Sequence, residues 1–116
     1  MKFEMDLTNN LAAQDMISII MEKMSLSEEE AVAFAITDER RERIIKTGWA
    51  RIAFNLWGHD DPYRKWGTLM NPVFEVNISP AQEQLLQDIK SRYHGDVKDA
   101  MNYFLVFAVS DLGCHI

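Results

Sequence analysis

The sequence predicts a mainly α-helical fold that contains a two-stranded antiparallel β-ribbon. Two short segments, residues 3–8 and 74–79, alternate apolar and polar side chains with the period of two expected of half-buried strands. After each segment, apolar residues recur at helical spacing. The two segments, FEMDLT and FEVNIS, have nearly the same chemistry. With 47% apolar residues, the 116-residue chain has ample material for a core.

The second strand-like segment leads directly into a predicted helix. Ser79 suits the N-cap, and Pro80 suits the first helical position, where its missing N–H costs nothing. We expect this helix to run to about Tyr93, because apolar residues follow at helical spacing. They are Leu85, Leu86, Ile89 and Tyr93.

A second helix is predicted from Val97 to about Leu112. Gly95 suits the end of the preceding helix, Asp96 can cap the new one, and Gly113 can stop it. This helix is apolar almost all round and therefore needs burial on most sides. An alternative makes MNYFLVFAV a strand, because aromatic and β-branched residues favour sheets.

The N-terminal third repeats this scheme. Residues 3–8 correspond to 74–79 at an offset of 71, and Ser27 stands where Asp96 stands at an offset of 69. Four features in the same order favour a duplication, whose two strands would pair within one chain. The alternative is two ordinary amphipathic segments. In the first helix, the corresponding apolar residues are Ile17, Ile20 and Met24.

The segment between the copies has a different character. Residues 38–57 predict a helix, which can continue from one that begins near Glu28, and residues 58–72 predict a long loop. We expect an apolar stripe of Ile45, Trp49, Ile52 and Leu56, with Arg40, Arg43, Lys46 and Arg51 mainly on the other side. The chain is thus divided into a first strand-helix-helix copy at 1–37, an insert at 38–71 and a second copy at 72–116, in one compact unit.

Residues 72–112 resemble the ribbon-helix-helix superfamily. The alternating strand, the Ser79 cap, Leu86 and Ile89 on the first helix, and GDVKDAMNYF at the second helix carry the likeness. In that family a second subunit supplies the partner strand. With a second copy at 2–37, the resemblance implies a single-chain tandem pseudo-dimer.

The resemblance also implies DNA binding, with outward strand residues in the major groove and the N-termini of the second helices on phosphates. The outward residues are Lys2, Glu4, Asp6, Val73, Glu75 and Asn77. The sequence departs from the family here, because three of them are carboxylates and both helix starts are acidic. Each carboxylate costs on the order of 1 kcal/mol against a polyanion.

We therefore expect a small non-enzymatic regulatory protein that acts by protein–protein interaction. The formal net charge of −6 repels nucleic acid, and an acidic ribbon suits a basic protein surface, as an inhibitor or adaptor of phage or mobile-element type would need. A merely solvated polar face is the alternative. The candidate partner-binding residues are Glu4, Asp6, Glu75 and Asn77 on the ribbon, and Trp57, Tyr63, Arg64, Lys65 and Trp66 in the loop.

A DNA-binding transcriptional regulator is the alternative function. It would use the basic cluster RRERIIKTGWAR, with loop aromatics stacking on bases. Its candidate residues are Arg40, Arg41, Arg43, Lys46 and Arg51. A structural assembly factor is a third, weaker class.

Catalysis, cofactors and metals have little support in the sequence. His59, Asp60 and Asp61, with His94 or His115, lack any metal-ligand spacing, and no phosphate loop or nucleophile elbow is present. The single Cys114 has no partner for an internal disulfide. The polar N-terminus predicts no signal peptide, and no apolar run is long enough to span a bilayer. We expect a cytoplasmic protein without catalytic residues, cofactor or metal.

Overall fold

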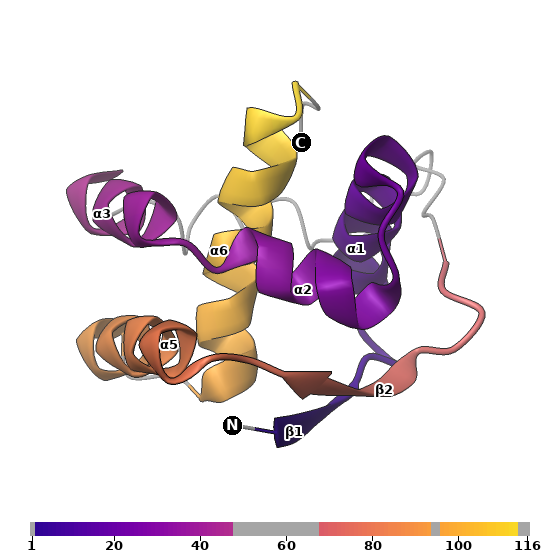
Figure 1. Cartoon of the computed structure of the whole chain (residues 1–116), viewed down its shortest axis with the longest axis horizontal. Coiled ribbons are helices and arrows are strands. Elements are labelled where there is room, and N and C mark those ends of the chain that lie inside the picture. Colours follow the sequence, from indigo (N-terminus) through magenta and orange to yellow (C-terminus); the bar gives the residue numbers. More distant parts are fainter. Residues whose placement is uncertain (1, 48–67, 94–95, 114–116) are drawn as a thin grey trace.

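The computed structural model describes residues 2–47, 68–93 and 96–113. Along this part of the chain a strand and three helices precede a second strand and two helices (Figure 1). This confirms the mainly helical fold with a two-stranded antiparallel sheet. The elements are β1 (Lys2–Asp6), α1 (Leu11–Met24), α2 (Glu28–Ala35), α3 (Asp38–Thr47), β2 (Val73–Asn77), α5 (Pro80–Tyr93) and α6 (Val97–Asp111).

The two strands pair antiparallel, as predicted, with Glu4 opposite Glu75 at the centre of the ribbon. Buried and exposed side chains alternate along both strands, as the sequence predicts. Met5 and Val76 are fully buried against the helices, while the side chains on the other face are exposed. Both strands have the same order of exposed, partly buried and buried positions, so one face of the ribbon covers the core and the other meets solvent.

Helix α6 runs through the centre of the helical layer, with α1 on one side and α3 and α5 on the other (Figure 1). All its residues from Ala100 to Val109 are buried, which explains its almost wholly apolar sequence. Asp96 and Asp99 cap it reciprocally, each carboxylate accepting a hydrogen bond from the other residue's backbone N–H. The helix therefore replaces the alternative strand at MNYFLVFAV, and Gly113 follows it with φ of +77°.

Helix α5 begins where Ser79 and Pro80 predict. The Ser79 hydroxyl accepts from Gln82 N at 3.1 Å, and the Gln82 side-chain oxygen accepts from Ser79 N at 3.1 Å. This is a reciprocal capping box, and Ser27 and Glu30 form another at the start of α2. The N-terminal caps that the sequence predicts at Ser27, Ser79 and Asp96 are all confirmed.

Core positions recur at the predicted offset of 69. Five buried residues of α1 and α2 have buried counterparts in α5 and α6, whereas the counterparts of Ala12, Ala13 and Met16 are not buried. The corresponding buried pairs are Ile17 and Leu86, Ile20 and Ile89, Ala31 and Ala100, Val32 and Met101, and Ala35 and Phe104.

The structure separates α2 from α3, a point that the sequence left open. Ile36 is extended, with φ of −87° and ψ of 96°, and Thr37 starts the new helix by accepting a hydrogen bond from Arg40 N. The last carbonyls of α2 are satisfied by side chains from elsewhere. Gln82 Nε2 donates to the carbonyls of residues 33 and 36, and Arg40 Nη1 donates to those of residues 34 and 35. The predicted start of a helix at residue 38 is therefore confirmed, and the possibility that it continues from the helix beginning near Glu28 is wrong.

The inward face of α3 also differs from the prediction. Ile44 is fully buried, whereas Ile45 is only partly buried. Arg40, expected on the solvent side, is 7% exposed, because its guanidinium turns inward to carbonyls and to Asp111 of α6. The other residues of the predicted stripe, Trp49, Ile52 and Leu56, lie outside the described residues. In the part of the chain that the structure describes, no helix is long and apolar enough to cross a membrane.

Candidate functional site

The solvent side of the ribbon brings together one group of the predicted residues. Because side chains alternate along a strand, every second residue of β1 and β2 points away from the core. We call these residues the ribbon face, and each of them is exposed. They are Lys2, Glu4, Asp6, Val73, Glu75 and Asn77.

The ribbon face is acidic. Three carboxylates against one ammonium group leave a net charge of −2. Glu4 and Glu75 are directly opposite each other, and a like-charge cross-strand pair costs about 0.2–1 kcal/mol. Asp6 is held in place, since its Oδ1 accepts from Thr8 N at 3.1 Å and from Thr8 Oγ1 at 2.6 Å. The face therefore keeps its negative charges at a cost in stability.

A buried glutamine fixes one end of the ribbon to α1. Gln14 Nε2 donates to the Leu7 carbonyl at 2.7 Å, and Gln14 Oε1 accepts from Leu69 N at 3.1 Å. Leu7 N donates to the Pro72 carbonyl at 2.9 Å. One side chain thus holds the backbone just after β1 and just before β2, so that end of the ribbon is rigidly placed.

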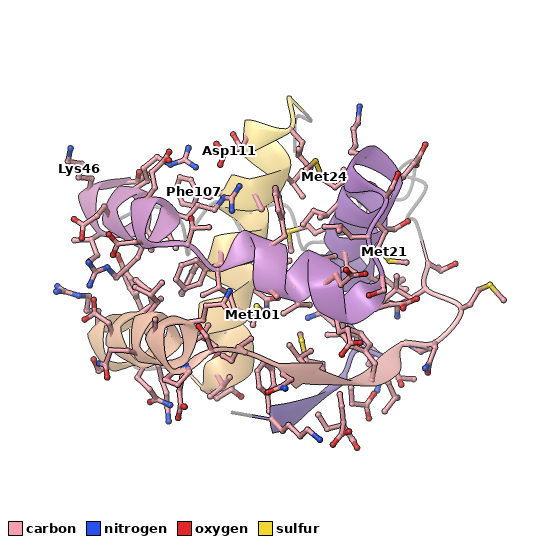
Figure 2. All side chains as sticks on the ribbon, viewed as in Figure 1. Met21, Met24, Lys46, Met101, Phe107 and Asp111 are labelled. Carbon is pink, nitrogen blue, oxygen red and sulfur yellow. The ribbon has the colours of Figure 1, made fainter. Side chains whose placement is uncertain are left out.

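The basic cluster of α3 has carboxylate partners inside the chain. Arg40 Nε donates to Asp111 Oδ2 at 2.9 Å, and Arg43 Nη2 donates to the same oxygen. Arg40 also lies over the ring of Phe34 at 4.8 Å, and Arg43 over that of Phe107 at 5.2 Å. Figure 2 shows Phe107 and Asp111 on α6, facing α3. These arginines join α3 to α6.

Arg41 projects toward α5. Its Nη1 lies 3.2 Å from Asp88, and its Nη2 lies 2.9 Å from Asp38 and 2.6 Å from Glu42. Asp88 also accepts from Arg92 at 3.1 Å. Of the residues proposed to hold phosphates, Arg40, Arg41 and Arg43 are therefore paired, Lys46 is exposed, and Arg51 lies outside the described residues.

The pairing with α3 changes the acidity of Asp111. Partial burial raises the pKa of its carboxyl group, but hydrogen bonds from Arg43 and Arg40 outweigh that effect and hold the pKa below its usual value. The carboxylate is thus fully ionised near neutral pH, which keeps both guanidinium partners in place.

The start of α2 is unsuited to phosphate. Glu28, Glu29 and Glu30 occupy its first turn, and hydrogen bonds from the backbone and side chain of Ser27 lower the pKa of Glu30. The helix N-terminus is therefore already served by side-chain anions.

The other predicted site residues lie outside the described residues. No group of three or more potential metal ligands occurs among the residues that the structure describes. The residues outside are the loop candidates Trp57, Tyr63, Arg64, Lys65 and Trp66, together with His59, Asp60, Asp61, His94, Cys114 and His115.

Sequence reasoning missed the side chains that position these surfaces, Gln14, Gln82 and Asp111. The Ser-x-x-Gln spacing of Ser79 and Gln82 carried a signal for one of them, since it is typical of a capping box. Gln14 and Asp111 had none, because their partners are distant in the sequence.

Comparison with protein-family models, curated proteins and solved structures gave no match to this chain.

Proposed function

We propose that this chain is a small non-enzymatic regulatory protein that binds a protein partner through the ribbon face, as an inhibitor or adaptor. The observation that supports this most is the position of Glu4, Asp6 and Glu75 on one exposed face with a net charge of −2. Such a face is complementary to a surface rich in Lys and Arg, and charge complementarity raises association rates and rejects wrong partners.

We also infer that the fold is a single-chain tandem of the ribbon-helix-helix type. The ribbon is centred on two equivalent glutamates, so that exchanging the strands places Phe3 on Phe74 and Met5 on Val76. The matching burial and capping of the following helices support the same exchange. In this arrangement one chain supplies both strands, and the outward faces of the two need not be identical.

DNA binding through α3 has less support. Arg40, Arg41 and Arg43 would have to leave Asp111 and Asp88 before they reached phosphates, and Arg40 is buried. The ribbon face would meanwhile repel the duplex.

A charge reversal on the ribbon tests the proposed function. We expect the wild-type protein, immobilised and exposed to extract from its source cells, to retain a protein that the Glu75→Lys variant does not retain. Glu22→Lys, an equal charge change at an exposed site on α1, is the matched control and should retain it.

Two results would contradict the proposal. One is equal retention of every captured protein by Glu75→Lys and by the wild type. The other is binding of wild-type protein to duplex DNA with an affinity that falls steeply as salt rises, which would show phosphate contacts.

A further inference from the structure

Met70 is an apolar side chain that the fold leaves in solvent. Its relative exposure is 103%, against 9% for the neighbouring Leu69, which is part of the core. Val73, the first residue of β2 and a member of the ribbon face, is 38% exposed. Scattered apolar residues are normal on protein surfaces, so exposure alone does not assign a role to Met70.

The backbone around Met70 is held on both sides. On one side Leu69 N donates to the buried Gln14 side chain, and the Leu69 side chain is buried. On the other side the Pro72 carbonyl accepts from Leu7 N at 2.9 Å. Met70 thus lies on a short segment whose two ends are hydrogen-bonded to the rest of the fold. Little backbone freedom would be lost when its side chain enters a pocket.

Met70 lies three residues before Val73, which is the first residue of β2 and a member of the ribbon face. Val73 pairs with Asp6, so the apolar end of the face adjoins an acidic position, and Glu4 and Glu75 follow at the next outward pair. Protein interfaces commonly combine apolar residues that become buried with polar residues next to them. Methionine suits such an anchor because its flexible, polarisable side chain adapts to irregular pockets.

We propose that Met70 and Val73 form the apolar anchor of the ribbon face and insert into an apolar pocket that basic residues surround on the partner protein. This rests on the proposed function and specifies its partner's chemistry. The occupant is not a second copy of this chain, since two ribbon faces would oppose equal charges of −2.

Short random peptides displayed on phage and selected on the immobilised wild-type protein provide the probe. We expect the selected peptides to be rich in Lys and Arg and to share one large apolar residue. Their affinity should fall about tenfold or more for Met70→Gln, as truncation of an interface anchor does. Met24→Gln removes another exposed methionine, at the far end of α1, and should leave the affinity within about twofold.

Methyl NMR gives a readout that does not depend on affinity. The chain has seven methionines, and the signal of Met70 is the one that Met70→Gln removes. We expect a selected peptide to shift the Met70 methyl signal and to leave that of Met24 in place.

The outcomes separate this inference from the proposed function. Basic peptides that fail to bind Glu75→Lys but bind Met70→Gln as tightly as the wild type would overturn the anchor and leave the acidic surface standing. Peptides without basic character, peptides indifferent to Glu75→Lys, or the selection of no peptide would overturn both.

Discussion

At the scale of single residues, the two glutamates that face each other across the ribbon form an electrostatically unfavourable pair. Glu4 and Glu75 are a directly opposed like-charge pair, and such pairs destabilise a sheet. Proteins often keep unfavourable residues where function needs them. This pair therefore agrees with a ribbon face that serves binding.

A double-mutant cycle that reverses the charges of Glu4 and Glu75 tests that pairing. Glu4→Lys and Glu75→Lys should each raise the free energy of unfolding by about 0.2–1 kcal/mol, because each creates an opposite-charge pair. The double variant restores like charges and should lose the gain. Urea unfolding measures all four proteins, and simple additivity of the two gains would show that residues 4 and 75 do not face each other. Because we expect Glu75→Lys to be more stable than the wild type, its failure to retain a partner would not be due to unfolding.

The shared carboxylate of Asp111 should be the most costly surface acid to remove. Asp111→Asn leaves Arg40, whose side chain is 9% exposed, without its anion, and we expect a loss of about 2 kcal/mol in the free energy of unfolding. Asp38→Asn removes an acid that is 76% exposed and should cost less than about 0.5 kcal/mol. Equal costs for the two variants would show that the Asp111 cluster is not structural.

The lowered pKa of Asp111 predicts a pH dependence. Its pKa is lower in the folded state than in the unfolded state, so its contribution is fully present above the unfolded value of about 3.9 and is lost as pH falls through the folded value. The difference in stability between wild type and Asp111→Asn should therefore be constant near neutral pH and shrink in acid. Urea unfolding at a series of pH values measures it, and a difference that grows in acid would contradict this cause.

At the scale of elements, Gln82 connects two helices. Its side-chain oxygen caps α5, while its amide NH₂ group serves the last carbonyls of α2. The separation of α2 from α3 therefore depends on a side chain that arrives from the other half of the chain.

Gln82→Glu separates these two roles. It keeps an oxygen that can cap α5 but loses the donor to α2, and we expect a loss of about 1–2 kcal/mol in the free energy of unfolding. Gln82→Ala loses the cap as well and should cost more. Thermal unfolding followed by circular dichroism measures both variants. Wild-type stability in Gln82→Glu would mean that the carbonyls of residues 33 and 36 do not need this donor.

At the scale of the whole molecule, both strands of the ribbon come from the same chain. A two-stranded ribbon is marginal alone, but here helices from both halves bury its apolar side. No second subunit is needed to pair either strand with the other.

Thermal unfolding at different protein concentrations tests this closure. We expect the midpoint Tm to stay the same over about a hundredfold range, because intramolecular pairing has no mass-action term. A midpoint that rises with concentration would show that a second chain completes the fold.

Local patterns determined much of this fold. The strands followed from a period of two over 3–8 and 74–79, and the caps at Ser27, Ser79 and Asp96 followed from side chains that bond the backbone three residues on. Such signals involve residues close together in the chain, so they can be recognised in a single sequence. The outward position of Glu4, Asp6, Glu75 and Asn77 came from the same alternation.

Only the tertiary structure decided which charged groups are paired within the chain and where α2 ends and α3 begins. The partners of the α3 arginines could not be predicted because Asp88 and Asp111 lie far along the chain. Helix α2 ends where the side chains of Gln82 and Arg40 donate to its last carbonyls. The same is true of Met70, which is exposed between two residues, Leu69 and Pro72, whose backbone is hydrogen-bonded to Gln14 and Leu7. Periodicity reports which face of an element is apolar, whereas the partner of a polar group depends on which elements the fold brings together.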